Sequence, residues 1–156
     1  MSKGENVNAA TTSGASCLYV AAENEKLDIV DHVLKLKSLD INQKRMNGRT
    51  PLFIAAINGH ISVVKQLVEN GSNIDLEVKE NEGMTPLLGS CFVGRVEIVK
   101  YLVDKGADLF ATTNDGTNCL ILAAGMENLR KYEAFPQKGS CGNASAIKEL
   151  LSFEKV

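Results

Sequence analysis

GRTPLFIAAINGHISVVKQLV, residues 48–68, is the stretch that decides the fold, because it predicts two short helices joined by a tight turn. Thr50 is suited to cap the first helix through its hydroxyl, and Pro51 is suited to the first helical position. Gly59 permits the turn, and apolar residues from Ile61 onward mark one face of a second helix. Each helix has only about two to three turns and is too short to persist alone in water. The unit therefore needs neighbours.

The start of this unit occurs four times along the chain. The four copies are Ser16–Leu18, Thr50–Leu52, Thr85–Leu87 and Asn118–Leu120. They are separated by steps of 34, 35 and 33 residues, and each is followed by a pair of small residues and then by a second apolar stripe, which is displaced in the last copy. Because several positions agree at once, the chain is predicted to be an array of similar helix pairs.

A period near 33 residues with these motifs resembles the ankyrin repeat, and the resemblance covers nearly the whole chain. It implies an all-α fold, an ankyrin-repeat solenoid of stacked helix-turn-helix units with projecting β-turn fingers. It also implies a single ankyrin-repeat domain over residues 1–156. The approximate repeats are 11–43, 44–78, 79–111 and 112–156, with an insertion within residues 125–144.

Composition sets further limits on function. The chain has 156 residues, which is the size of one domain, and 44% of them are hydrophobic, which suffices for a core. A net charge of −2 disfavours nucleic acid or an anionic membrane as the partner, because such binding rests on a surplus of Lys and Arg. The apolar stretches are too short for a membrane span, and the polar opening is no signal peptide. We expect a monomer inside the cell, in the cytoplasm or the nucleus.

The four cysteines predict no metal site. Cys17, Cys91, Cys119 and Cys141 are too far apart in sequence to provide a close pair of zinc ligands. Cys17 and Cys119 occupy the position where the resembled family prefers Pro, and Cys91 occupies an Ala position, so we expect all three to be small core residues with reduced thiols. Cys141 is expected in a loop, with nothing beside it to lower its pKa.

The sequence offers no arrangement typical of catalysis. The two histidines, His32 and His60, have no serine, cysteine or carboxylate partner in a recognised catalytic pattern. His60 fills the Gly-His turn of the resembled family, which is a structural position. We therefore expect no enzyme activity, no cofactor and no metal.

Three deviations from the pattern distinguish this chain. The connector 40–49 is basic and the connector 75–84 is largely acidic, so two neighbouring fingers either neutralise each other or form a charge-matched site for a partner. Gly89 inside a predicted helix costs about 0.5–1 kcal/mol relative to Ala and should make that helix the softest of the interior. The first helix pair has polar residues on its outer face, as expected of a makeshift cap.

The insertion within 125–144 leaves two alternatives open. It lengthens the last repeat by 15 residues relative to the second. One alternative is a tolerated surface loop, since insertions between repeat helices fall outside the stacked core. The other is a partner-specific arm that uses Leu129, Tyr132 and Phe135 as one apolar face.

The resemblance implies that the finger tips and the ends of the first helices hold another protein. Carried over position by position, the predicted partner-binding residues are Lys44, Met46, Asn47, Arg49, Ile57, Asn58, Lys79, Asn81, Glu82, Met84, Phe92, Val93, Asn114 and Asp115. The apolar members are expected to form a contiguous exposed strip inside a polar rim, the usual form of a binding hot spot. The alternative is that Ile57 and Phe92 belong to the core.

These observations favour a non-catalytic protein–protein interaction module, an adaptor or scaffold that binds a protein partner on its concave face. A second hypothesis is a targeting fragment of a larger enzyme, since ankyrin arrays occur beside catalytic domains. A third is an inhibitor that occupies the surface of an enzyme.

Overall fold

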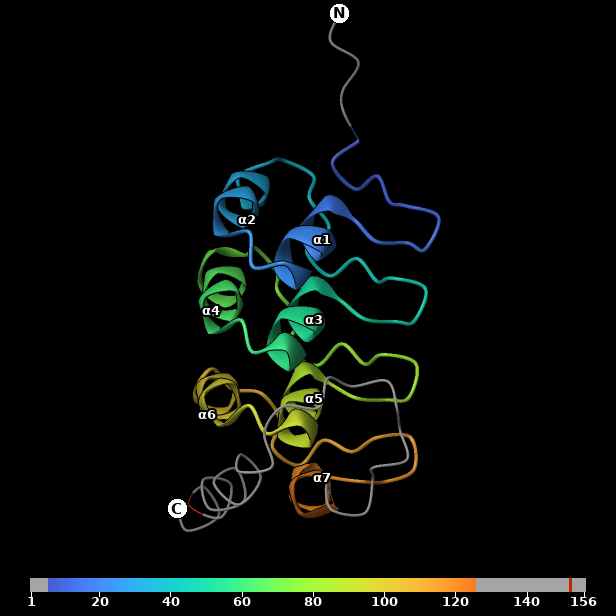
Figure 1. Ribbon diagram of the computed structural model, residues 1–156, viewed down its shortest axis with the longest axis vertical. Helices are drawn as coiled ribbons and strands as arrows, with labels where there is room; N and C mark the ends of the chain where they lie inside the picture. The colour runs from blue at the N-terminus through green and yellow to red at the C-terminus, as the bar shows by residue number, and fades with distance from the viewer. Residues whose placement is uncertain (1–5, 126–151, 153–156) are drawn as a thin grey trace, which may run out of the picture.

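The computed structural model of the chain describes residues 6–125 and residue 152. This part of the chain contains helices and no strand. The helices are α1 (Cys17–Glu23), α2 (Leu27–Leu34), α3 (Pro51–Asn58), α4 (Ile61–Asn70), α5 (Pro86–Val93), α6 (Val96–Asp104) and α7 (Cys119–Gly125). They stand in two columns, with α1, α3, α5 and α7 in one and α2, α4 and α6 in the other (Figure 1). The predicted all-helical stack is confirmed.

The first helix of each complete pair begins in the same way. Thr50 caps α3, because its hydroxyl oxygen accepts a hydrogen bond from the Phe53 N–H at 3.2 Å. Pro51 follows at the first helical position, and Gly59 caps the C-terminal end of α3 with a φ of +84°, which favours glycine. Ser16 and Thr85 cap α1 and α5 by the same bond. The sequence motif that repeats is therefore the capping motif of the first helix.

The helix columns bury the same positions in each repeat. Leucine fills one such position in the first helices and valine fills another in the second helices. These are Leu18, Leu52 and Leu87, and Val30, Val64 and Val99, all of them buried. Contacts run from α1 to α3, from α3 to α5 and from α5 to α7, so the core is one continuous cluster along the stack. Because a short helix pair cannot bury both of its faces alone, stability depends on these neighbours.

Gly89 lies at a close approach between α5 and α3. A Cβ atom at this position would stand 2.9 Å from Ile57 Cγ2 and 3.1 Å from the ring of Phe53. Glycine thus permits the close approach of two helices, which is a packing reason for a residue that is otherwise unfavourable in a helix. The softness of α5 stays a prediction.

The cysteines follow the expectation in two positions out of three. Cys91 and Cys119 are buried, and the hydrogen bond between their thiols, followed by burial, raises the pKa of Cys91, so this thiol stays protonated. Cys17 is exposed, and its predicted burial is wrong. The reason is that Cys17 belongs to the outer end of the stack, at the edge of an open groove. Cys141 lies outside the described residues.

The connectors between helix pairs fold into similar turns that project away from the α2, α4 and α6 column (Figure 1). We call residues 10–15, 44–49, 79–84 and 112–117 fingers one to four, and together the finger row. In finger two the Arg45 N–H donates to Arg49 O at 2.9 Å and the Gly48 N–H donates to Arg45 O at 2.8 Å. Two matching bonds at 2.8–3.0 Å close each of the other fingers. The four fingers therefore share one pattern of backbone hydrogen bonds.

The predictions for the insertion within 125–144, with Leu129, Tyr132 and Phe135, lie outside the described residues. In the part of the chain that is described, no helix has the length and apolar character needed to cross a membrane. Nor do three or more His, Cys, Asp and Glu side chains gather there as a metal site would require.

Candidate functional site

Lysine side chains connect neighbouring fingers. The Lys44 ammonium donates to Lys79 O at 3.1 Å, and the Lys79 ammonium donates to Thr112 O at 2.8 Å. Both predicted site residues thus extend from one finger to the backbone of the next. Their charges remain at the surface, since both residues are exposed.

Asparagines make a second set of links at the finger tips. The Asn81 side-chain amide donates to Met46 O at 3.3 Å, and the Asn81 N–H donates to Asn47 O at 3.2 Å. Asn114 repeats this arrangement one finger further, donating to Asn81 O at 3.1 Å and to Glu82 O at 3.2 Å. These five predicted site residues are therefore brought together, and the hydrogen bonds hold fingers two to four in a fixed row.

The predicted apolar strip is mostly buried. Ile57, Met84 and Phe92 are only 4%, 8% and 6% exposed and belong to the core. Met46 is 75% exposed at the tip of finger two, and Val93 is partly exposed at the end of α5. The prediction of a contiguous exposed strip is wrong, because three of its five members pack among the helix layers. The alternative that Ile57 and Phe92 are core residues is the one that the structure supports.

Two arginines of finger two lie against aromatic rings of the first helices. The Arg45 guanidinium lies 5.5 Å from the ring centroid of Tyr19, and the Arg49 guanidinium lies 5.4 Å from that of Phe53. Such contacts restrict a flexible cation and are worth about 0.5–1 kcal/mol at exposed sites. Arg49 was among the predicted residues and Arg45 was missed. The matching aromatic positions in α1 and α3, next to a basic connector, would have indicated it.

The carboxylates of finger three have different environments. Glu80 is buried, and its Oε1 accepts hydrogen bonds from the Glu82 N–H at 2.8 Å and from the Met84 N–H at 3.1 Å. This carboxylate therefore closes its own finger. Glu82, a predicted site residue, is exposed at the tip. Only part of the acidic character predicted from the sequence thus remains at the surface.

Asp115 is a fixed negative charge on finger four. Its Oδ1 accepts hydrogen bonds from the Thr113 hydroxyl, from the Thr117 hydroxyl at 2.7 Å and from the Thr117 N–H at 3.2 Å. These bonds stabilise the charged form, so they hold the pKa of the Asp115 carboxyl below its usual value. The finger row is consequently basic at finger two and acidic at the tips of fingers three and four.

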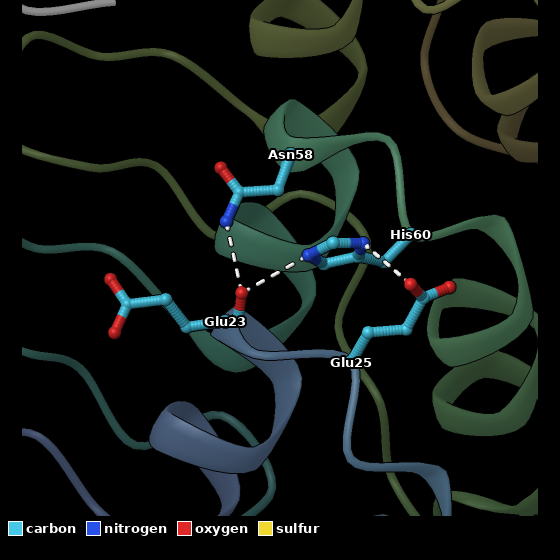
Figure 2. A network of polar contacts seen from close by, with 4 residues as sticks. All are labelled: Glu23, Glu25, Asn58 and His60. Atoms are coloured by element: carbon cyan, nitrogen blue, oxygen red, sulfur yellow. Dashed lines mark hydrogen bonds and ion pairs between the residues drawn. The ribbon is translucent and has the colours of Figure 1, made fainter. Parts of the chain in front are cut away.

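Asn58 has a structural role at the junction of the first two helix pairs (Figure 2). Its side-chain amide donates to Glu23 O at 3.2 Å, and His60 Nε2 lies 3.0 Å from the same oxygen. Because a carbonyl only accepts, Nε2 must carry a hydrogen. His60 Nδ1 lies 3.4 Å from Glu25 Oε2, a contact that would be an ion pair only with a charged imidazole. Two side chains of the second pair thus hold the C-terminal carbonyl of α1.

The next junction uses an arginine for the same purpose. Arg95 follows the turn after α5, as His60 follows the turn after α3, and its Nε donates to Ile57 O at 3.0 Å. This carbonyl lies near the C-terminal end of α3. At both junctions, the residue after the turn between the two helices of a pair therefore binds a carbonyl of the preceding pair. That carbonyl lies at the C-terminal end of the first helix of the preceding pair.

Phe110 is a surface residue that the sequence interpretation missed. It is 78% exposed in the connector after α6. At the matching positions, the side chains of Asn42 and Glu77 accept hydrogen bonds from the N–H groups of Asp75 at 3.0 Å and Asp108 at 2.8 Å. Alignment of the connectors on their turn glycines would have shown that an aromatic residue replaces these acceptors.

The chain matches the family described as ankyrin repeats in three overlapping copies, over residues 1–80, 18–113 and 72–133. These ranges include all seven described helices and all four fingers. The match therefore covers more than half of the chain.

Several curated proteins are similar to part of the chain. The ankyrin repeat-containing protein ITN1 of Arabidopsis thaliana is 36% identical over 69 residues, which are 44% of this chain and 12% of that protein. The poly [ADP-ribose] polymerase tankyrase of Caenorhabditis elegans is 35% identical over 69 residues, 42% of this chain and 3% of that protein. The ankyrin repeat domain-containing protein 49 of Bos taurus is 35% identical over 57 residues, 36% of this chain and 24% of that protein. The chain thus spans less than a quarter of the length of these relatives.

Proposed function

Since the chain belongs to the ankyrin-repeat family, we propose that it is an adaptor or scaffold that binds a protein partner on the finger row. Ankyrin repeats are generally non-catalytic protein-interaction modules. One observation carries the proposal for this chain. Hydrogen bonds between neighbouring fingers hold the backbone of the finger row in place, whereas its exposed side chains differ from one finger to the next.

A row held in this way is suited to binding. Met46, Asn81 and Asn114 occupy matching tip positions, and all three are exposed. Their backbones are already ordered by bonds between fingers, so little conformational entropy remains to be lost when a partner binds. The proposed contact residues are the exposed and partly exposed members of the finger row and its edge. They are Lys44, Arg45, Met46, Asn47, Arg49, Lys79, Asn81, Glu82, Val93, Asn114 and Asp115.

The charges of the finger row indicate the chemistry of the partner. Arg45 and Arg49 present planar guanidinium groups held against aromatic rings, which suits carboxylates of a partner segment. Glu82 and Asp115 suit basic side chains further along the same segment. We therefore propose a protein segment with acidic residues near finger two and basic residues near fingers three and four. Such complementarity contributes to specificity and to the association rate more than to affinity.

The proposal is tested by site-specific photo-crosslinking in the source cell. A photoreactive phenylalanine analogue replaces Met46 in one variant and the exposed Lys65 of α4 in a matched control. We expect the Met46 variant to crosslink a defined protein and the Lys65 variant to give no crosslink to that protein. Equal crosslinking from both positions, or crosslinking from Lys65 alone, would refute binding at the finger row.

A second candidate function rests on the similarity to tankyrase, a relative named as a polymerase of which this chain matches 3%. In that case the finger row would hold the substrate or anchor of a larger enzyme. An antibody against this chain, used on extracts of the source cell, separates the two candidates. A band near 16.8 kDa favours a separate adaptor, and a much larger polypeptide that carries a catalytic domain favours the second candidate.

A further inference from the structure

Three Asn–Gly pairs occur in the sequence, and the structure places them in different surroundings. They are Asn47–Gly48 in finger two, Asn58–Gly59 at the end of α3 and Asn70–Gly71 at the end of α4. An asparagine side chain before a glycine is open to attack by the glycine nitrogen, because glycine has no Cβ to hinder the approach. The surroundings of each pair therefore decide where the chain reacts.

The pair in finger two differs from the other two in its backbone. The Gly48 N–H donates to Arg45 O at 2.8 Å within the finger, so attack by its nitrogen requires this one bond to open. Asn58 and Asn70 are instead the last residues of α3 and α4, and the N–H groups of the glycines that follow them bond to carbonyls of those helices. Opening there unwinds the last turn of a packed helix. Finger two therefore releases the reacting nitrogen at a lower cost in free energy.

The side chain of Asn47 is oriented for the reaction. Its Oδ1 accepts a hydrogen bond from the Arg49 N–H at 3.1 Å, which folds the side chain over the intervening Gly48. When the Gly48 nitrogen attacks Cγ, negative charge develops on Oδ1, and a donor that is already in place stabilises this charge. The Asn58 side chain is held by its other end, since its amide nitrogen donates to Glu23 O at 3.2 Å. That bond holds the leaving group of the reaction in place.

We propose that Asn47 is a site of spontaneous deamidation, which gives finger two an acidic tip. The Gly48 nitrogen forms a bond with Cγ of Asn47, and the side-chain nitrogen leaves as ammonia with the proton that the Gly48 nitrogen loses. Water then adds to one of the two carbonyl carbons of the resulting cyclic imide. Ring opening gives either aspartate at position 47 or its isoaspartate isomer, in which the main chain runs through the former side chain.

The packing of the finger row keeps the glycine of this pair in place. Gly48 has a φ of +80°, and a Cβ atom there would stand 2.8 Å from Asn81 N, so the position requires glycine. The residue before the matching glycine is a serine, an asparagine, a glutamate and an aspartate in fingers one to four. Finger two is thus the one with an amide at this position.

Finger four shows how an aspartate fits the position. Asp115 matches Asn47, and its Oδ1 accepts a hydrogen bond from the Thr117 N–H at 3.2 Å, as Oδ1 of Asn47 does from the Arg49 N–H. An aspartate at position 47 therefore keeps the bond that orients the side chain and adds a negative charge to the tip.

The effect on binding rests on the function proposed above. Asn47 lies between Arg45 and Arg49, which are assigned to acidic residues of the partner, so a negative charge at position 47 opposes that contact. Isoaspartate also lengthens the main chain by one atom and displaces Asn47 O, which accepts a bond from the Asn81 N–H at 3.2 Å. Deamidation thus lowers the affinity of finger two for an acidic segment as the chain ages.

The first test measures the reaction without any partner. The full chain is kept in warm, mildly alkaline buffer, and digestion with mass spectrometry follows the conversion of amide to acid at the three pairs. We expect position 47 to react about tenfold faster than positions 58 and 70, because one hydrogen bond to a developing anion is worth about that factor. In strong denaturant the three rates should become similar. A folded chain in which position 47 reacts no faster than the two helix ends would overturn the proposal.

A variant identifies the source of the ammonia. Asn47→Ser introduces the residue that finger one has at this position and should abolish the fast phase of ammonia release. Persistence of that phase in Asn47→Ser would assign the reaction to another residue and would equally overturn the proposal.

The second test measures the effect on binding, with an oligoglutamate peptide as the probe. Asn47→Asp should bind this peptide about two- to fivefold more weakly than the wild type, as expected for one surface charge. Asn70→Asp adds the same charge at an exposed position of α4 and should leave binding unchanged. An equal loss in both variants would overturn the effect on binding. Failure of the wild type to bind the peptide would contradict the acidic partner proposed for finger two, whereas the reaction rates would still decide the modification.

Discussion

The helix layers and the finger row are built from the same repeat, but they differ in how similar the residues at matching positions are. Leu52 and Leu87 place the same residue at the same depth, and both are fully buried. Met46 and Asn81 occupy matching finger tips, and they differ in chemistry although both are exposed. A core side chain is close-packed against its neighbours and tolerates little change, whereas a tip faces water. The helix layers therefore determine the fold, and the finger tips distinguish this chain from others with that fold.

The largest effect is expected from a truncation in the helix layers. Leu87→Ala removes a fully buried side chain of α5 and should lower the free energy of unfolding by about 2–5 kcal/mol. Met46→Ala, the control in the finger row, should change it by less than about 0.5 kcal/mol. Urea unfolding followed by circular dichroism measures both. Similar losses in the two variants would contradict the division between layers and tips.

The next largest effect on stability is expected at Gly89, where α5 lies close to α3. Gly89→Ala gains about 0.5–1 kcal/mol of helix propensity but introduces a Cβ 2.9 Å from Ile57 Cγ2. Overpacking of a dense core typically costs about 1–3 kcal/mol, so we expect a net loss of stability. Ser62→Ala, at an exposed position of α4, serves as a control for a change in helix propensity without a change in core packing. A variant at Gly89 that is more stable than the wild type would show that α5 is soft, as the sequence alone predicted.

A smaller effect is expected at the junction between the first two helix pairs. His60→Ala removes a hydrogen bond to Glu23 O and should cost about 1 kcal/mol. His60→Arg should recover most of this loss, because Arg95 makes the corresponding bond to Ile57 O at the next junction. Thermal melting of the three proteins checks the order. If arginine were no better than alanine, the two junctions would not be equivalent.

The smallest effect concerns finger four and its dependence on pH. Hydrogen bonds hold the pKa of Asp115 below its usual value, so the carboxylate contributes stability at neutral pH that is lost as the pH falls through the folded-state pKa. The Thr117 N–H, which bonds to Asp115, should therefore exchange faster below about pH 4. Hydrogen exchange by NMR checks this. In Asp115→Asn that acid-dependent step should be absent, and its persistence would assign it to another group.

Much of the fold could be predicted from the sequence because its determinants are local. The cap formed by Thr50, the proline at position 51 and the turn at Gly59 depend on neighbouring residues only. Their recurrence at nearly constant spacing then predicts the stack, since each short helix pair needs a neighbour. The fingers between the pairs were predicted from the resemblance to the ankyrin repeat rather than from these local determinants.

The depth of individual side chains could not be predicted in this way. Phe92 is buried near the end of α5, a helix that packs against first helices on both sides, α3 and α7. Cys17 was expected to be buried because its position suits a core residue, but it lies at the open end of the stack. The contact of Arg45 with Tyr19 joins a finger to a helix of the preceding pair. All three depend on relations between repeats rather than on the pattern within one.

The central claim is that a protein partner binds on the finger row. Hydrogen exchange of the full chain, with and without the partner captured through Met46, tests it most directly. We predict that the partner slows amide exchange in residues 44–49, 79–84 and 112–117 and leaves the amides of α2, α4 and α6 unchanged. Protection confined to α2, α4 and α6, with no change in the fingers, would contradict the account.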